Sequence, residues 1–287
     1  MARILIIGAA GFLGSNFAHY FLQNQDNFVI GIDNLSSSKF NTLYPLLKYD
    51  RFIFLEHDMT DYLDENCDFI YNFSGSGDKT VFLNDKYEYI TNQIEIIKNI
   101  LKLSSENGAK PFFVSEFHNY IQNNNNIFEY YNYENLMFDL VNQYSIKCQS
   151  DYKILRLDNV FGQYFNINDN RFIFSAIKNA LSNINIDITY DIGNYYTYID
   201  DICDKVNYLS NNYTDKKFYT ISSKNLKYYS EIASEIIKLT NSNSKIVIKN
   251  SSKIKPDFDI VSNFECSCDF QNSLLKTIKY AQLIYFS

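Results

Sequence analysis

The sequence predicts an α/β protein built on a doubly wound parallel sheet, with a smaller C-terminal lobe. Two observations support this fold class. Short apolar runs alternate with segments that carry apolar residues at helical spacing, and this alternation is typical of parallel strands covered by helices. Past residue 160 the pattern loosens into shorter segments, so we expect a domain at 1–160 and a lobe at 161–287. The expected strands lie at 3–7, 28–32, 51–55, 68–73, 111–115 and 152–157.

Two long helices are expected in the middle of the chain. Residues 86–107 carry isoleucines and a leucine at helical spacing, and residues 131–146 carry a second apolar face of the same period. The asparagine run 123–126 before the second helix is expected to be a polar loop.

The first thirty-four residues contain the most informative pattern. An apolar run enters the segment Gly8–Gly14, a helical pattern follows, and a second apolar run ends at Asp33. Gly8 permits a tight turn, Gly11 lets backbone N–H groups approach a pyrophosphate, and Gly14 lets helix and strand pack closely. The helix N-terminus, at Phe12 and Leu13, adds partial positive charge. The alternative is a glycine-rich turn in an α/β domain that binds no ligand.

Asp33 indicates which ligand such a turn would bind. It lies nineteen residues after Gly14, where a carboxylate can accept hydrogen bonds from an adenosine ribose. We therefore predict a Rossmann domain that binds a dinucleotide. A carboxylate would repel a 2′-phosphate, and no lysine or arginine follows before Lys39, so NAD is favoured over NADP. The serines between them leave NADP open, since hydroxyls can also bind a phosphate.

The glycine spacing at the N-terminus, followed by Asp33-Asn-Leu-Ser-Ser, resembles the extended short-chain dehydrogenase/reductase family of NAD-dependent epimerases and dehydratases. These are nucleotide-sugar epimerases, dehydratases, decarboxylases and ketoreductases. The resemblance extends over most of the chain. Further segments that match in order are 57–61, 68–75, Asn92, 155–162 and 198–202.

The resemblance implies a set of binding residues and partners. It implies that the chain returns from the lobe to the sheet, that the substrate is a nucleotide-diphosphate sugar, and that the two long helices form a homodimer. It places a substrate contact at Asn159. Arg171 is the closest free cation in the lobe that follows and is the second expected substrate contact, whereas we expect Arg156 to be buried and structural. The cofactor contacts that the resemblance implies beyond the glycine turn and Asp33 are Asn34, Ser37, Asp58, Met59, Phe73, Ser74, Gly75, Asn92, Tyr131 and Asn135.

The catalytic residues depart from the family pattern, which is a Ser or Thr followed by Tyr-x-x-x-Lys. The best alignment keeps Tyr131 but puts Asn135 at the lysine position. The Ser or Thr position falls near Phe117, with Ser115 two residues earlier. No lysine occurs between residues 110 and 147, so no shift of register restores the motif.

This departure has a chemical consequence. A tyrosine has a pKa near ~10, and a neighbouring cation can lower it by roughly 1–3 units. Asn135 is neutral and cannot do this, although it can donate a hydrogen bond to a ribose. Tyr131 would then be a better acid than base, which favours reduction of a ketone. His118 is an alternative acid or base, but a histidine at a strand end is more often bonded to backbone.

Three functions remain open. The first is a 4-ketoreductase of surface-polysaccharide sugar biosynthesis, because the short segment from Ser115 to Tyr131 is similar to that of CDP-paratose and CDP-abequose synthases. The second is an epimerase, dehydratase or decarboxylase with a rearranged catalytic set, because residues 57–60 and 70–71 resemble UDP-glucuronate decarboxylases. The third is a non-catalytic protein that binds NAD or a nucleotide sugar.

Composition excludes several classes. A net charge of −7 and a pI near 5.0 argue against nucleic acid or an anionic membrane as a partner. No apolar stretch approaches the ~18–20 residues that span a bilayer. The five cysteines are scattered without zinc-ligand spacing, so we expect reduced thiols in the cytoplasm and no metal site.

Overall fold

The computed structural model describes residues 2–75, 82, 84–116, 125–166, 168–224, 226–256, 264–266 and 269–285; within these ranges it leaves out the side chains of 116, 125–132, 134 and 251. The chain forms two compact units. Unit 1 comprises residues 1–116, 122–156 and 206–219, and unit 2 comprises 117–121, 157–205 and 220–287. The chain thus leaves the first unit after Arg156 and returns to it. The predicted division at residue 160 stays a prediction.

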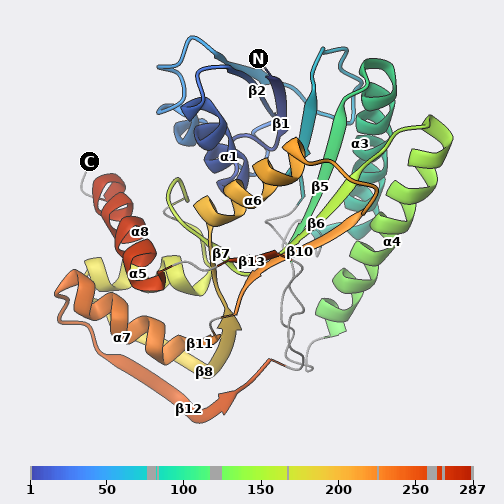
Figure 1. Cartoon of the computed structure of the whole chain (residues 1–287). Coiled ribbons are helices and arrows are strands. Elements are labelled where there is room, and N and C mark those ends of the chain that lie inside the picture. Colours follow the sequence, from blue (N-terminus) through green and yellow to red (C-terminus); the bar gives the residue numbers. More distant parts are fainter. Residues whose placement is uncertain are drawn as a thin grey trace. The chain divides into compact units, whose positions relative to one another are not determined.

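An eight-stranded sheet has the order β13-β10-β6-β5-β4-β1-β2-β3, which confirms the predicted fold class (Figure 1). Strand β1 pairs in parallel with β2 and β4, β2 pairs in parallel with β3, and β4 pairs in parallel with β5. The strand order reverses at β1, which is where doubly wound sheets bind their ligands. The strands are β1 (Ala2–Ile7), β2 (Asn27–Asp33), β3 (Phe52–Glu56), β4 (Phe69–Asn72), β5 (Lys110–Glu116), β6 (Lys153–Leu157), β10 (Phe218–Ser223) and β13 (Phe264–Cys266).

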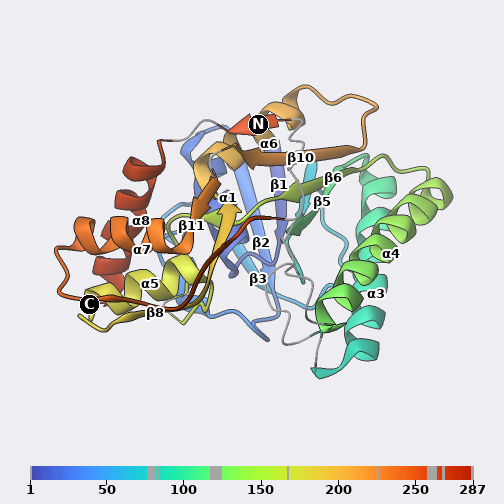
Figure 2. The ribbon, with the colours of Figure 1, turned by 90° about the horizontal axis from the view of Figure 1, so that it is seen from below.

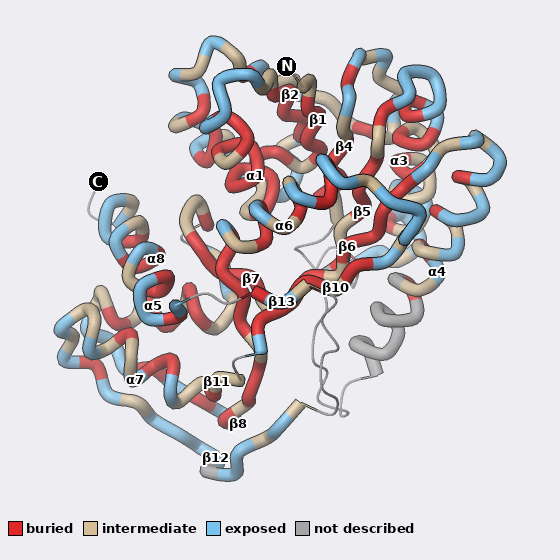
Figure 3. Tube along the Cα trace, in the orientation of Figure 1, coloured by how far each residue is buried: buried red, intermediate tan, exposed pale blue. Residues whose placement is uncertain are grey.

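Three helices of unit 1 cover this sheet. Helix α1 (Phe12–Gln23) lies on one face, and α3 (Lys86–Asn107) and α4 (Asn125–Cys148) lie side by side on the other (Figures 1 and 2). The connections from strand to strand run in opposite directions on the two sides of β1. Because such crossovers are right-handed, α1 lies on one face of the sheet and α3 and α4 lie on the other. Most residues of the strands β1, β5 and β6 are buried (Figure 3).

The ends of the two long helices differ in how well the sequence predicts them. Helix α3 has the predicted bounds, because the Asp85 carboxylate caps it by accepting from the Glu88 N–H at 3.0 Å and because Gly108 ends it with φ +70°. Helix α4 begins at Asn125, so the predicted polar loop is wrong at positions 125 and 126. Positions 123 and 124 lie outside the described residues.

Tyr71 of β4 is one of the largest fully buried side chains in unit 1. Its ring stacks on Phe21 at 5.1 Å and on Phe112 at 5.0 Å between centroids. Its hydroxyl lies 2.6 Å from the hydroxyl of Ser210, so this buried polar group is satisfied.

Unit 2 contains two small sheets, β11-β8-β12 and β7-β9, together with helices that include α5, α7 and α8. Helix α6 begins in unit 2 and ends in unit 1. No helix in the described ranges is both long enough and apolar enough to cross a membrane. The remaining elements are η1 (Phe40–Leu43), β7 (Val160–Phe161), α5 (Phe172–Leu181), β8 (Ile186–Tyr195), β9 (Thr197–Tyr198), α6 (Ile199–Asn211), β11 (Leu226–Tyr228), α7 (Tyr229–Thr240), β12 (Ile246–Ile254) and α8 (Phe270–Tyr285).

Candidate functional site

The glycine turn between β1 and α1 is shaped by its lack of side chains. Gly8 has φ +77°, a conformation that L side chains rarely adopt. A Cβ on Gly14 would lie 2.1 Å from the carbonyl oxygen of Gly8, so the first turn of α1 rests directly on the strand end. The N–H groups of Gly8 and Ala9 both donate to the carbonyl of Ile32, at 2.8 and 3.0 Å, which ties the turn to β2.

Gly11 is less crowded than its neighbours. A Cβ there would meet only the Gly8 carbonyl oxygen at 3.2 Å and the Ser38 hydroxyl at 3.8 Å. Helix α1 starts at the next residue, Phe12, without a side-chain cap and without an acidic residue in its first turn. No carboxylate within the first turn of the helix offsets the partial positive charge of its start, and this arrangement suits an anion.

Asp33 at the end of β2 is buried and bonded to the glycine turn. One carboxylate oxygen accepts from the Ala10 N–H at 3.0 Å, and the other accepts from the Leu35 N–H at 2.8 Å. Burial raises the pKa of this carboxyl, and the two backbone bonds lower it in part. Two carboxylate oxygens offer about four acceptor positions, so Asp33 retains capacity to accept from ribose hydroxyls.

The loop after β3 is fastened to the loop after β2. The Asn34 amide donates to the Asp58 carboxylate at 2.8 Å, and Asp58 also accepts from the N–H and hydroxyl of Thr60. Burial tends to raise the pKa of Asp58, but these hydrogen bonds and the nearby His57 outweigh it and lower the pKa. The predicted contact residues Asn34 and Asp58 are therefore brought together, and Met59 beside them is buried.

Three residues that the sequence motif did not indicate support these loops. The Thr42 hydroxyl donates to the carbonyl of Ala10 at 2.8 Å, and the Asn99 amide donates to the carbonyls of Met59 and Thr60 at 2.9 Å. Ser38 is the third, since its hydroxyl faces the Gly11 position, whereas the predicted Ser37 is exposed. Their partners lie far away in sequence, so no local pattern could have identified them.

The predicted cofactor contact Asn92 lies on the long helix α3. Helix α3 starts at Lys86, and Asn92 is exposed in its second turn. The asparagine of α3 that does contact the loop after β3 is Asn99, two turns further along the helix.

The end of β4 forms a second tight turn next to the glycine turn. The Asn72 side chain accepts from the Ser74 N–H at 3.1 Å and from its hydroxyl at 2.6 Å. Gly75 has φ +77°, and its carbonyl accepts from the Tyr89 hydroxyl at 2.6 Å. A Cβ on Gly8 would lie 3.0 Å from the backbone of Phe73. The turns at the ends of β1 and β4 are therefore in contact.

The predicted catalytic residues are only partly described. Ser115 is buried near the end of β5, and Asn135 is half-buried on α4. The side chain of Tyr131 lies outside the description, as do Phe117 and His118. The side-chain amide oxygen Oδ1 of Asn135 accepts a long hydrogen bond, 3.5 Å, from the Arg156 guanidinium. The structure thus places a cation beside the neutral residue at the lysine position.

The two predicted substrate residues belong to unit 2, and both already have partners there. The Asn159 amide nitrogen donates to the Asp158 carboxylate at 2.8 Å and to the Tyr195 carbonyl at 3.2 Å. Arg171 was expected to be a free cation, but it forms an ion pair with Asp169 at 2.7 Å. Either residue would have to exchange a partner in order to bind a phosphate.

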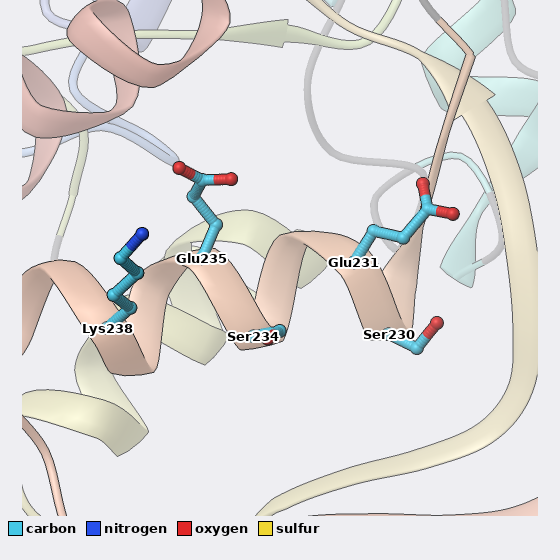
Figure 4. A pocket seen from close by; sticks show the side chains of 5 residues that line it. All are labelled: Ser230, Glu231, Ser234, Glu235 and Lys238. Atoms are coloured by element: carbon cyan, nitrogen blue, oxygen red, sulfur yellow. The ribbon is translucent and has the colours of Figure 1, made fainter.

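Among the described residues, no group of three or more histidine, cysteine or acidic residues is placed to hold a metal ion. A hollow on unit 2 is lined by Ser230, Glu231, Ser234, Glu235 and Lys238, all from helix α7 (Figure 4). Because one helix supplies every lining side chain, no second element encloses a ligand there.

Comparison with protein families gives a match over most of the chain. The model described as the NAD dependent epimerase/dehydratase family matches residues 4–221. A UDP-glucuronic acid decarboxylase of Arabidopsis thaliana is 28% identical over 198 residues, which cover 62% of this chain and 57% of that protein. The chain therefore spans little more than half the length of the curated relatives it matches.

Solved structures show the same fold. The UDP-glucuronic acid 4-epimerase of Bacillus cereus in complex with NAD has a TM-score of 0.82 at 19% identity, covering 99% of this chain and 97% of the other. The UDP-N-acetylglucosamine 4-epimerase of Methanobrevibacter ruminantium in complex with UDP-N-acetylmuramic acid has a TM-score of 0.82 at 20% identity, covering 99% of both chains.

Proposed function

The chain belongs to the NAD-dependent epimerase/dehydratase family, and we propose that it binds NAD and transfers a hydride between NAD and a nucleotide-diphosphate sugar. The observation that carries the proposal is the intact glycine turn. Only glycine fits at Gly14, and the start of α1, which has no side-chain cap, offers an anion site beside Gly11.

The residues of unit 1 fit a dinucleotide. We assign the pyrophosphate to the backbone from Gly11 to Gly14, including Phe12 and Leu13, and the adenosine ribose to Asp33. The adenine would lie along Asn34, Ser37, Asp58 and Met59, with Phe73, Ser74 and Gly75 near the middle of the cofactor. The buried carboxylate of Asp33 supports NAD over NADP, because it would repel a 2′-phosphate.

Bound NAD would supply the hydride acceptor or donor, and this chain's own groups would move the proton. As the reaction we propose reduction of a keto sugar, as in a 4-ketoreductase that makes surface-polysaccharide sugars. Tyr131 would donate its phenolic proton to the carbonyl oxygen of the keto sugar, and the reduced cofactor NADH would supply the hydride for the carbonyl carbon. The neutral amide of Asn135 favours this direction, because it leaves the phenol protonated at neutral pH.

A second candidate is oxidation of a sugar hydroxyl as the first step of an epimerase, dehydratase or decarboxylase. Two observations favour it. The chain is similar to UDP-glucuronic acid decarboxylases, and Arg156 places a cation next to Asn135. In this direction Tyr131 would have to accept the hydroxyl proton, which requires a lowered pKa.

The test is identification of the ligand and then of the reaction. We would release small molecules from the purified protein for mass spectrometry, and measure NAD affinity by calorimetry. NADH oxidation with a UDP-4-keto sugar would support the reductase, and conversion of UDP-glucuronic acid without net NAD consumption would support the second candidate. NAD binding without turnover on keto- and hydroxy-sugar nucleotides would favour a non-catalytic protein. No affinity for either dinucleotide would contradict the proposal.

Three further expectations stay predictions. The substrate contacts at Asn159 and Arg171 are predicted to weaken binding of a UDP-sugar when replaced by alanine, without changing NAD affinity. The homodimer through α3 and α4 is to be checked by sedimentation, and the cytoplasmic location by fractionation.

A further inference from the structure

We propose that Asn159 binds a hydroxyl or N–H group of the substrate through its side-chain oxygen, and that it does not bind the diphosphate. This inference rests on the proposed function, because it concerns how unit 2 would recognise a nucleotide-diphosphate sugar. Asn159 is half-buried and lies between β6 and β7. All of the contacts that carry the inference lie within unit 2.

The side-chain nitrogen of Asn159 is already engaged. Its Nδ2 donates to the Asp158 carboxylate at 2.8 Å and to the backbone carbonyl of Tyr195 at 3.2 Å. An asparagine amide has two N–H donors, so these two bonds use both of them. The nitrogen therefore has no donor left for a phosphate oxygen.

The two neighbours also fix which way round the amide lies. A carboxylate and a backbone carbonyl only accept hydrogen bonds. If the nitrogen and the oxygen of Asn159 exchanged places, the oxygen would face two other oxygens with no hydrogen between them. The hydrogen-bond network therefore selects the orientation with Nδ2 toward Asp158 and Tyr195. Because the amide is planar, Oδ1 lies on its opposite side.

The side-chain oxygen Oδ1 of Asn159 is the group that remains available. Among the described residues no hydrogen bond reaches it, and it is not one of the buried side-chain atoms that lack a partner, so it is accessible to solvent. An amide oxygen accepts hydrogen bonds and cannot donate one. It can bind a sugar or ribose hydroxyl or a base N–H, whereas an ionised diphosphate offers only acceptors.

The carboxylate behind the amide strengthens this preference. Asp158 is 1% exposed, and it also accepts from the Asn159 backbone N–H at 2.7 Å and from the Ser222 hydroxyl at 2.8 Å. A carboxylate that accepts from Nδ2 polarises the amide and makes its oxygen a stronger acceptor. The same negative charge repels an anionic group. Asp158 therefore favours a neutral donor at Asn159 over a phosphate.

The backbone around Asn159 is held as well. Its carbonyl accepts from the Thr197 N–H at 3.1 Å, next to the pairing of Val160 with Thr197 that joins β7 to β9. The Thr197 hydroxyl is buried and accepts from the Ser223 N–H at 2.9 Å. An acceptor fixed through both its backbone and its side chain loses little conformational entropy when a ligand binds. Asn159 is thus preorganised to select ligands by the group that they present.

The test compares UDP-glucose, UDP and uridine, which contain successively less of a nucleotide sugar. We expect Asn159→Ala to weaken UDP-glucose binding about five- to tenfold in calorimetry, because one hydrogen bond is lost. A loss confined to UDP-glucose would assign the donor to a hexose hydroxyl, and a loss shared by all three would assign it to the nucleoside. Both results support the inference.

Two results of this comparison would overturn the inference. A loss shared by UDP-glucose and UDP but not by uridine would place Asn159 on the diphosphate, and no loss with any ligand would remove it from the site. Asn179→Ala is the matched control, because the Asn179 amide on α5 of the same unit also donates to a backbone carbonyl, that of Asn185. We expect this variant to bind all three ligands as the native chain does.

A second measurement needs neither a variant nor a ligand. In NMR spectra of the native chain, we expect both side-chain N–H protons of Asn159 to exchange with solvent about tenfold more slowly than those of the exposed Asn243. Equally fast exchange would overturn the inference. A native chain that binds neither UDP-glucose nor UDP would contradict the nucleotide-sugar part of the proposed function, and slow exchange would then still establish that Asn159 presents an acceptor.

Discussion

The glycine turn, Gly8–Gly14, and the proposed catalytic end of unit 1, at Tyr131 and Asn135 on α4, differ in how much sequence change we expect them to tolerate. At the glycine turn the structure depends on backbone positions that exclude side chains, such as Gly8 and Gly14. At the catalytic end it depends on the chemistry of single side chains, and there Asn135 stands at the lysine position. There the guanidinium of Arg156, from the strand β6, contacts the side chain of Asn135.

This difference shows why the two regions carry unequal information in a sequence. Few sequences can form a site made by the backbone, so its glycines identify it directly. Many sequences can form a site made by side-chain charge, because the charge can come from any residue that the fold brings near.

The largest expected effect tests the catalytic end. Tyr131→Phe removes only the phenolic hydroxyl, so we expect turnover to fall roughly 10²–10⁴-fold while NAD affinity is unchanged. Steady-state kinetics and calorimetry check the two parts. Tyr144→Phe on the same helix is the control, and equal activity of the two variants would move the acid–base role elsewhere.

The next effect tests the glycine turn. We expect Gly14→Ala to lower the free energy of unfolding by roughly 3–5 kcal/mol, because the added methyl group would lie 2.1 Å from the Gly8 carbonyl oxygen. Urea unfolding measures this. Gly108→Ala is the matched control, because a Cβ at Gly108 would meet nothing within 4 Å. The only expected loss of stability in this variant, about 1–2 kcal/mol, comes from the left-handed φ of that residue. Similar losses in both variants would show that the turn is not tightly packed.

A pH effect is expected on α1, the helix that follows the turn. Burial and then Lys48 lower the pKa of His19 from 6.5 to about 4. The unfolded chain therefore binds the proton more tightly, so stability is full above pH 6.5 and is lost as pH falls toward 4, by roughly 3 kcal/mol. Urea unfolding at several pH values tests this. His19→Leu should flatten the profile over this range, and a slope that persists in the variant would assign it to another group.

The smallest expected effect concerns cofactor choice. We expect Asp33→Asn to weaken NAD binding by about tenfold and to improve NADPH relative to NADH, because the negative charge facing a 2′-phosphate is gone. Calorimetry with both cofactors measures the ratio. Asp26→Asn is the control, since Asp26 is exposed in the turn before β2. A native chain that prefers NADPH would contradict the interpretation of Asp33.

Much of unit 1 follows from the sequence. The six predicted strands and α3 are found, because their apolar periods and the Asp85 and Gly108 end signals are local. The start of α4 was missed, because asparagines carry no apolar period and favour turns. The contacts of Thr42, Asn99 and Arg156 join residues 21 to 40 positions apart, and such pairings depend on the fold rather than on neighbouring residues.

The bond between Asp33 and the Ala10 N–H also has a kinetic consequence. Together with the bond from Asn34 to Asp58, it ties the loops at the ends of β1, β2 and β3 to one another. A dinucleotide that enters such a site orders little of the chain, so little conformational entropy is lost on association. Binding should therefore proceed in a single step in stopped-flow fluorescence, at a rate proportional to NAD concentration and without a slow rearrangement.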